Sequence, residues 1–491
     1  MNKYILSLDQ GTTSTRALLM DFSGSIVGLV QKEITQIYPK NGWVEHDPVE
    51  ILNSAFYVID ELIKKQNINP DDIKSIGITN QRETTVLWDK ETGNPIHNAI
   101  VWQDNRTIDI CDRLIKNKLN DKISQKTGLL IGTYFSATKI KWILDNNPQI
   151  YAKAKSGKIL FGNIDSWLVW NLTNRSTHAT DFSNASRTML FNIHTLEWDD
   201  DILKELNIPK SILPEVKNSS NNFGSFNYRG TNIPINGILG DQQASLFGHK
   251  CYEKKSIKNT YGTGCFLLMN TGDEVINSKN GLLSTIAWGI ENKISYALEG
   301  SIFIGGAGVQ WLRDELKIIN SSEESEIEAL KSNKDNLYLI PAFNGLGAPY
   351  WDMRASGMII GISRDTNKSD IIKATLNSIA FQTKDVLISM ENDVGSKIQM
   401  LSVDGGASQN NYLMQFQSNI LGINLKRPHN SELTALGAGY MAGMQAGLWD
   451  IKELKKLNSE HKQYSYNFNP EQINELYGNW KKAVKRSMQW Y

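Results

Sequence analysis

A chain of 491 residues is too long for one hydrophobic core, so we expect two or three domains. Basic and acidic residues balance at 52 each, and 40% of the residues are hydrophobic. This composition lacks the basic surface that attracts nucleic acids or anionic membranes, and it favours a globular protein that acts on small molecules.

Three cysteines, Cys111, Cys251 and Cys265, are scattered along the chain. Their odd number and wide spacing argue against a disulfide framework or a structural zinc site and favour a reducing compartment. The N-terminus leads directly into a strand-like run, and no stretch reaches the roughly 18 apolar residues of a membrane-spanning helix. We therefore predict a cytoplasmic protein with no membrane insertion and no nucleic-acid partner.

The first residues predict a β-meander. Apolar runs at 4–8, 16–22 and 26–34 are typical of strands. The polar segment D-Q-G-T-T-S-T at 9–15 predicts a tight turn between the first two strands, and it is large enough to hold a phosphate group.

A helix is predicted next, because Asp47 and Pro48 are typical of a helix N-terminus. Its apolar residues recur at helical spacing and predict one buried stripe, formed by Leu52, Ala55, Phe56, Ile59, Leu62 and Ile63. Two further strands are expected, at 74–79 and 84–88.

The second half of the chain repeats this order of elements. A strand, a glycine-rich turn and a second strand are predicted at 256–260, 261–265 and 266–269. Another strand at 397–403 ends in D-G-G-A-S at 404–408. It is followed by a helix with one apolar face, formed by Leu413, Phe416 and Ile420.

This weak internal duplication predicts an α/β fold with two domains, residues 1–250 and 251–491. Ligands are expected in the cleft between them, since pockets often lie between domains.

The glycine–threonine turns are the candidates for phosphate binding, since the sequence has no P-loop motif and no dinucleotide-binding G-x-G-x-x-G. Asp9 ends the first strand and precedes Gly11, Thr12 and Thr13. A carboxylate at this place can hold Mg²⁺, partly through water, while backbone N–H groups and hydroxyls bind phosphate oxygens. An ordinary hairpin turn is the alternative.

Similar turns recur at 262–264 and 405–406, so three turns suggest a nucleotide held from both halves of the chain.

Nine motifs follow one another from the start of the chain to about residue 450. They are D-Q-G-T-T-S-T-R at 9–16, G-W-V-E-H-D-P at 42–48, N-Q-R-E-T at 80–84, W-Q-D-N-R-T at 102–107, G-D-Q-Q-A at 240–244, Y-G-T-G-C-F at 261–266, V-Q-W-L-R-D at 309–314, D-G-G-A at 404–407 and L-T-A-L-G-A-G-Y-M-A-G at 433–443. Together they resemble the carbohydrate-kinase family that has two actin-like, ribonuclease-H-like domains, and within it the glycerol kinases.

The resemblance implies that ATP phosphorylates glycerol to sn-glycerol 3-phosphate, with Mg²⁺, in glycerol catabolism. It implies a substrate site in the cleft formed by Arg82, Glu83, Trp102, Tyr134, Asp241 and Gln242. A charged donor beside a charged acceptor suits a triol, because each hydroxyl both donates and accepts hydrogen bonds. On the residues alone, the pair at 82 and 83 could equally be a solvent-exposed ion pair.

Asp241 would be the catalytic base by this resemblance. By itself it is typical of a helix N-cap before Gln242, and the two roles are compatible. Asp9 and Asp241 would hold Mg²⁺. The implied nucleotide-binding residues are Thr12, Thr13, Ser14, Arg16, Thr263, Gly306, Gln310, Gly406 and Asn410. A homo-oligomer, a dimer or a tetramer, is also expected.

Two other functions stay open. A kinase of another polyol or sugar is the nearer alternative, and it would need different residues at 82, 83, 102 and 134. The second alternative is a nucleotide-dependent binding protein like actin and its chaperone relatives. That function would not explain the presence of Asp241.

Regulation is where the sequence departs from the resemblance. Some glycerol kinases bind fructose 1,6-bisphosphate through a glycine–arginine loop, and others are activated by phosphorylation of a histidine in the same region. Here Asn232 stands in place of the arginine and Asn227 in place of the histidine, with Arg229 nearby. Asparagine has neither the charge nor the imidazole, so we predict insensitivity to both controls.

Overall fold

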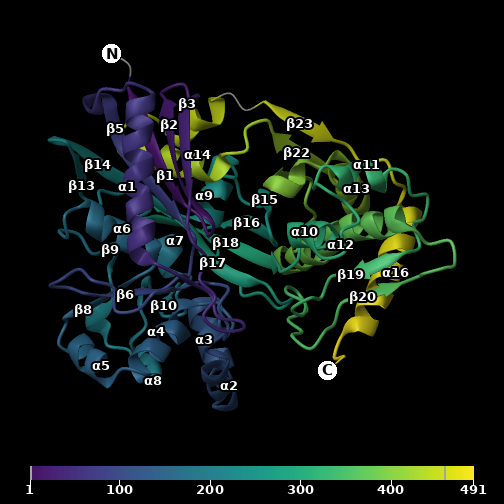
Figure 1. Ribbon diagram of the computed structural model, residues 1–491, viewed down its shortest axis with the longest axis horizontal. Helices are drawn as coiled ribbons and strands as arrows, with labels where there is room; N and C mark the ends of the chain where they lie inside the picture. The colour runs from purple at the N-terminus through teal and green to yellow at the C-terminus, as the bar shows by residue number, and fades with distance from the viewer. Residues whose placement is uncertain (1–2, 458–459, 491) are drawn as a thin grey trace.

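The computed structural model describes residues 3–457 and 460–490. The molecule is built around two mixed β-sheets, each with its own hydrophobic core. In Figure 1 the early, purple and blue elements lie on the left and most later, green and yellow elements lie on the right. Within the described residues, no helix is both long and apolar enough to cross a membrane.

The first sheet has six strands, in the order β13 (Ser225–Tyr228), β14 (Thr231–Gly240), β5 (Ile73–Asn80), β1 (Tyr4–Gln10), β2 (Ser14–Asp21) and β3 (Ile26–Glu33). The predicted meander is confirmed, because β1, β2 and β3 pair antiparallel in sequence order. Strands β1, β5 and β14 are parallel, with Gln10 and Gly240 both in register with Asn80. The residues that follow these three strands therefore leave the sheet at one edge.

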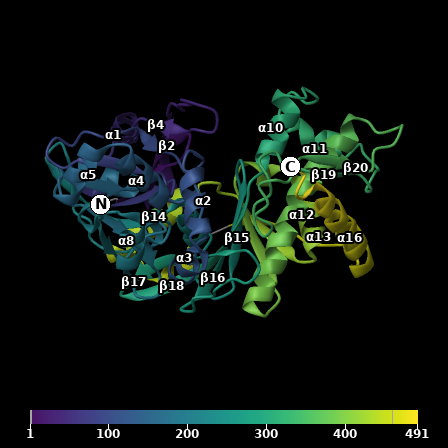
Figure 2. The same cartoon turned by 90° about the horizontal axis from the view of Figure 1, so that it is seen from below.

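The second sheet has seven strands, in the order β17 (Leu283–Ile290), β18 (Lys293–Ile302), β16 (Cys265–Gly272), β15 (Ile257–Tyr261), β21 (Met400–Asp404), β22 (Asn424–Pro428) and β23 (His461–Tyr464). Strands β15 and β21 are parallel, with Thr260 opposite Asp404, so the turns after them also lie side by side. Figure 2 shows β17 and β18 extending from this sheet toward elements of the first half.

The strand predicted at 397–403 is wrong at its start, since β21 begins only at Met400. The preceding residues instead contact Glu391 near the end of α12 (Lys368–Val394). Lys397 forms an ion pair with the Glu391 carboxylate at 2.6 Å, and the Ile398 N–H donates to it at 3.0 Å.

The other strand pairs in the described part of the chain are short. They are β4 (Glu45–His46) with β7 (Ala99–Ile100), β6 (Val86–Asp89) with β8 (Ile159–Gly162), β9 (Ala179–Asp181) with β12 (Glu215–Lys217), β10 (Phe191–Asn192) with β11 (Glu197–Trp198), and β19 (Tyr338–Ile340) with β20 (Met358–Ile360). The strand predicted at 84–88 is confirmed as β6, with bounds later by one or two residues.

Helix α1 (Pro48–Lys65) covers one face of the first sheet (Figure 1). Its predicted start is confirmed, since the Asp47 carboxylate accepts a hydrogen bond from the Val49 N–H at 2.8 Å. The predicted stripe is wrong at Phe56, which is 36% exposed and packs against Phe226 at the surface. The buried face is rotated, and it includes Ile51 and Val58 instead.

The opposite face of the first sheet is covered by α14 (Leu433–Gln445), which comes from the second half of the chain, and by α9 (Asp241–Gly248). Glycines allow this close packing. A Cβ at Gly77 would lie 2.2 Å from the Ala438 carbonyl oxygen, and one at Gly437 would lie 1.9 Å from that of Ala244.

Helices α2 (Ile108–Lys116), α3 (Asn120–Thr127), α4 (Ser136–Asp145), α5 (Pro148–Lys155) and α8 (Asp200–Leu206) surround a third core at the lower left of Figure 1. The remaining helices are α6 (Ile164–Leu172), α7 (Phe182–Ala185), α10 (Gly306–Asp314), α11 (Glu324–Ala329), α13 (Asn411–Leu421), α15 (Ile451–Lys456), α16 (Pro470–Ser487) and the 3₁₀ turns Pro70–Asp72, Lys210–Ile212 and Gly406–Gln409. The predicted apolar face of α13 is confirmed, because Leu413, Phe416 and Ile420 are all buried.

Gly437→Ala is expected to destabilise the protein, because the new methyl group would meet backbone atoms that cannot move without separating α14 from α9. Overpacking of this kind costs about 1–3 kcal/mol or more. Thermal unfolding followed by circular dichroism would measure it. Gly478→Ala in α16 is the control, since nothing lies within 4 Å of its Cβ position. Equal melting temperatures for the two variants would contradict this packing.

Candidate active site

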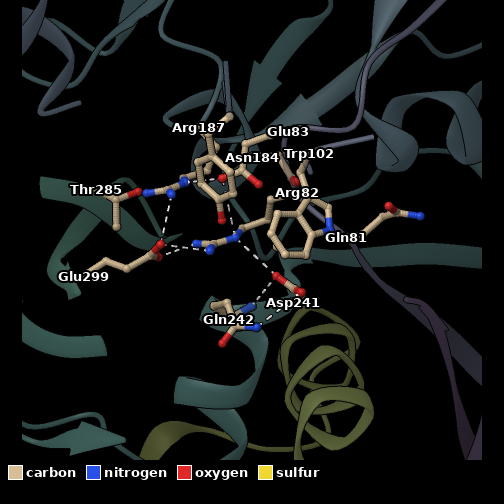
Figure 3. A network of polar contacts seen from close by, with 12 residues as sticks. Gln81, Arg82, Glu83, Trp102, Asn184, Arg187, Asp241, Gln242, Thr285 and Glu299 are labelled. Carbon is tan, nitrogen blue, oxygen red and sulfur yellow. Dashed lines mark hydrogen bonds and ion pairs between the residues drawn. The ribbon is translucent and has the colours of Figure 1, made fainter. Parts of the chain in front are cut away.

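The fold brings two of the predicted loops and the start of α9 to one edge of the first sheet. The turn after β1 and the segment after β5 are tied by a hydrogen bond of 2.7 Å from the Gln81 N–H to the Gln10 carbonyl. Helix α9 begins directly after β14 at the same edge. Figure 3 shows the side chains that these elements direct toward one another.

Arg82 and Glu83 are both buried, at 2% and 1% exposure, so the interpretation as a solvent-exposed ion pair is wrong. The Arg82 Nε lies 3.2 Å from Asp241 Oδ1 and 3.9 Å from Glu83 Oε1. One guanidinium and two carboxylates thus converge on one small volume.

The backbone at Glu83 has a φ of +60°, a conformation that is uncommon for a residue with a Cβ. Neighbours hold it there: the Ser136 and Thr85 hydroxyls each donate to its carbonyl oxygen at 3.1 Å, and the Arg187 Nε donates to Oε1 at 2.7 Å. Such strain is typical of functional sites.

Aromatic rings form another wall. Trp102 packs edge-on against Tyr134 and Phe266, with ring centroids 5.6 and 6.1 Å away. The Trp102 Nε1 also donates to the Thr12 hydroxyl at 2.9 Å, so this wall is joined to the first phosphate-sized turn. Burial raises the pKa of the Tyr134 phenol well above its usual value, so the side chain stays a neutral hydroxyl.

Asp241 is the first residue of α9, and Gly240 occupies the N-cap, so the predicted N-cap role of Asp241 is wrong. Its side chain is 29% exposed. Oδ1 accepts from the Gln242 N–H at 2.7 Å, and the Gln242 side-chain amide donates to Oδ2 at 3.3 Å. A negative charge is favoured at this end of a helix.

Lys258, on β15, fixes the direction of the Gln242 amide. Its Nζ donates to Gln242 Oε1 at 2.5 Å, so the amide NH₂ group points to Asp241. Burial lowers the pKa of Lys258 to about 8, although Asp404 and Asp241 oppose the shift.

Asp9 is 6% exposed at the end of β1. Burial raises its pKa to about 7, with Arg16 opposing the shift and Asp241 and Glu432 adding to it. Arg16 Nη1 lies 3.8 Å from Asp9 Oδ2 and 3.7 Å from Glu432 Oε2. A buried carboxylate near another acid fits a hard divalent cation, which would offset the repulsion.

The described residues include no group of three or more acidic, histidine or cysteine side chains that could hold a metal. Mg²⁺ at Asp9 and Asp241 would therefore complete its coordination with water and phosphate oxygens, as this ion commonly does.

The glycine turns of the second half are interlocked through their backbones. The Gly306 N–H at the start of α10 donates to the Gly262 carbonyl at 2.8 Å. Gly405 has a φ of +88°, and a Cβ there would lie 2.5 Å from the Tyr261 carbonyl oxygen. Gly406 has open space at its Cβ position, which leaves room for a ligand.

The other predicted nucleotide-binding residues differ in exposure. Thr263 and Gln310 are exposed, and Asn410 caps α13 by accepting from the Leu413 N–H at 2.9 Å. Thr12 and Thr13 are accessible in the first turn, whereas Ser14 is buried and its hydroxyl accepts from Gln31 at 3.1 Å.

The two halves meet at α9. Ser245 on this helix donates to Asp404 Oδ2 at 2.9 Å, at the end of β21. The helix that begins with Asp241 therefore contacts the end of the second sheet as well as the first.

Residues 4–248 match the N-terminal domain of the FGGY family of carbohydrate kinases, and residues 257–446 match its C-terminal domain. The chain belongs to the FGGY family of carbohydrate kinases. This FGGY kinase is 57% identical to a glycerol kinase of a Thermoanaerobacter species, and the alignment covers all of this chain and 99% of that protein.

Solved structures agree with this assignment. The structure is similar to that of Plasmodium falciparum glycerol kinase with ADP, with a TM-score of 0.92 and 38% identity over 99% of this chain and 98% of that one. Gluconate kinase from Lactobacillus acidophilus shares the fold, with a TM-score of 0.87 and 22% identity over 99% and 98% of the chains. The predicted resemblance, the two-domain α/β fold and the kinase activity class are confirmed.

Several residues of this site were missed by sequence reasoning. They are Arg187, Gln243, Lys258, Phe266 and Glu299. One signal was present for Glu299, since it is a single charged residue in the otherwise uncharged strand interior Y-A-L-E-G-S-I.

Proposed function

We propose that this FGGY kinase transfers the γ-phosphoryl group of ATP to glycerol and forms sn-glycerol 3-phosphate, as a step of glycerol catabolism. The observation that carries the proposal is the 57% identity to a glycerol kinase over the whole chain. The Arg82 guanidinium, 3.2 Å from the Asp241 carboxylate and 3.9 Å from that of Glu83, supports the same substrate.

Glycerol would bind against the first sheet. The Arg82 guanidinium donates hydrogen bonds to its hydroxyl groups, and the carboxylates of Glu83 and Asp241 accept them, with Gln242 adding an amide. Trp102 and Tyr134 cover the carbon edge. Charged partners strengthen each hydrogen bond to about 1.5–3 kcal/mol.

ATP would lie across both halves. Its phosphates are bound by the first turn and its remainder by the second half, through Thr12, Thr13, Ser14, Arg16, Thr263, Gly306, Gln310, Gly406 and Asn410. Mg²⁺, held by Asp9 and Asp241 partly through water, would neutralise charge on the phosphate oxygens.

Asp241 would act as the general base. Its carboxylate accepts the proton of a terminal glycerol hydroxyl while that oxygen attacks the γ-phosphorus in line. The bond from phosphorus to the β–γ bridging oxygen breaks, and ADP leaves with its electron pair.

We assign polyol and phosphate binding to residues 1–250 and nucleotide binding to residues 251–491, although α14 packs on the first sheet. Closure of the cleft between the two domains would exclude water as a competing acceptor.

The proposal is tested by ADP formation from ATP and Mg²⁺ with and without glycerol. We expect ADP to form only slowly until glycerol is added. ADP release at the same rate without glycerol would favour the nucleotide-dependent binding protein instead. A faster reaction with another polyol or sugar would favour a related kinase.

A homo-oligomer, a dimer or tetramer, is also proposed. Ile327 and Leu330 on α11 are 60% and 65% exposed, and exposed apolar side chains of this kind support self-association. Phe343 and Met353 line a cavity of about 560 Å³ in the same half.

We place the enzyme in the cytoplasm, which supplies ATP and suits three free cysteines.

Fructose 1,6-bisphosphate is expected to leave the activity unchanged. The Asn227 side chain donates to Asn232 Oδ1 at 2.7 Å across the hairpin of β13 and β14, and Arg229 is paired with Asp60 at 2.8 Å. The Arg229 guanidinium is thus already engaged. Titrating the bisphosphate to millimolar concentration in the coupled assay checks this, and clear inhibition would refute it.

A further inference from the structure

Two buried residues outside the predicted site hold Arg82 and Glu83 in place. Glu299 on β18 accepts from Arg82 with both oxygens, at 2.5 Å from Nη1 and 3.0 Å from Nη2. Arg187, which follows α7, donates from Nε to Glu83 at 2.7 Å and from Nη2 to Glu299 at 2.9 Å. Figure 3 shows this alternation of two arginines and two glutamates beside Asp241.

Glu299 and Arg187 each hold one of the two proposed polyol-binding side chains. The two terminal nitrogens of Arg82 are directed to Glu299, and Nη1 also contacts Gln243 at 3.2 Å. The Nε edge of Arg82 therefore faces Asp241 and Glu83. Arg187 donates a hydrogen bond to Glu83 Oε1. This bond restrains a side chain whose backbone is in the unfavourable positive-φ region.

All four side chains are at most 2% exposed, and their formal charges cancel. Burial alone would raise the pKa of Glu299, but Arg187 and Arg82 outweigh it and lower the pKa to about 2. Buried ion pairs add little stability relative to apolar side chains of the same size, so stability alone does not explain four charges at this place.

We infer that Arg187 and Glu299 are positioning residues that fix Arg82 and Glu83 for polyol binding. Glu299 belongs to the second sheet, whereas the other three residues belong to the first half. The polyol site is thus assembled by both halves of the chain, although the substrate groups come from the first. This inference rests on the proposed function.

Glu299→Gln is the test, because it keeps the shape of the side chain and removes its charge. We expect the KM for glycerol to rise by about 10–100-fold, as is typical when a residue that orients a ligand-binding group is changed. The dissociation constant for ADP, measured by calorimetry, is expected to stay within about twofold, since none of the four residues belongs to the nucleotide turns. Arg187→Lys, which keeps the charge but loses the paired donors, is expected to raise the glycerol KM by a smaller factor.

A purely structural role would give a different pattern. Asp385→Asn is the matched control, since this buried carboxylate accepts from Tyr477 at 2.6 Å and from Trp480 at 2.8 Å, all on α12 and α16. It is expected to lower the melting temperature and leave the glycerol KM unchanged. An unchanged glycerol KM in folded Glu299→Gln overturns the inference.

If Glu299→Gln does not fold, Arg187→Lys decides: a raised glycerol KM supports the inference and an unchanged KM overturns it. Wild-type protein without glycerol-dependent ADP formation would instead refute the proposed function itself. The double variant Glu299→Gln with Arg187→Lys adds a further check, because residues that act as one unit give a double effect on the glycerol KM smaller than the product of the two single effects.

Discussion

Asp241→Asn is expected to lower kcat by about 10²–10⁴-fold, the usual contribution of a general base. The asparagine keeps the size of the side chain, and the Gln242 N–H can still donate to its oxygen, so the start of α9 should be retained. The loss of the 3.2 Å ion pair with Arg82 is expected to raise the glycerol KM only modestly. Steady-state kinetics with a coupled ADP assay, together with ADP affinity by calorimetry, measures both effects.

Asp200→Asn is the matched control, because Asp200 is also the first residue of a helix but its side chain is 77% exposed and pairs with Lys210 at the surface. It should leave kcat unchanged. Wild-type turnover in Asp241→Asn would remove this residue from the mechanism.

Arg82→Ala and Glu83→Ala are expected to weaken glycerol use more than nucleotide binding. Each truncation removes one of two buried ion-pair partners: that of Glu299 in the first variant and that of Arg187 in the second, while the Arg187–Glu299 pair stays. The loss of a buried hydrogen-bond partner costs about 1–3 kcal/mol, which corresponds to about a 5- to 150-fold rise in the glycerol KM. The measurement compares the glycerol KM with the dissociation constant for ADP in each variant.

Arg229→Ala serves as the control for removal of an arginine, since that side chain is 63% exposed on the β13–β14 hairpin. It should change neither constant. Lost nucleotide affinity with an unchanged glycerol KM in the Arg82 or Glu83 variants would reverse the assignment of the pocket.

The sequence predicted those parts of the fold that depend on short-range patterns. The meander of β1 to β3, the start of α1 at Asp47 and Pro48, and the apolar face of α13 all follow from local periodicity and turn residues. The error at Phe56 has a tertiary cause. This ring packs on Phe226, which belongs to a hairpin far away in the sequence. The spacing of apolar residues along the helix gives no information about such a contact.

The family resemblance, and not the strand pattern alone, picked out Asp9, Arg82 and Asp241, which lie at or just after the carboxyl ends of three parallel strands. The supporting residues of the site were not predicted. Glu299 is 217 positions from Arg82 along the chain, and Arg187 is 104 positions from Glu83. Their pairing depends on the packing of β18 beside the first half, which the strand patterns alone do not specify. The passage of α14 across the first sheet was missed for the same reason.

The most direct measurement is the ratio of kcat/KM for glycerol to that for erythritol, xylulose and gluconate, with ATP and Mg²⁺ held constant. The Arg82 guanidinium and the Glu83 and Asp241 carboxylates offer partners for the three hydroxyl groups of glycerol, so a longer polyol or sugar would have to place its additional hydroxyl groups elsewhere. Glycerol is therefore expected to exceed each of the others by at least about 100-fold. A higher kcat/KM for any of the three longer substrates would contradict the account.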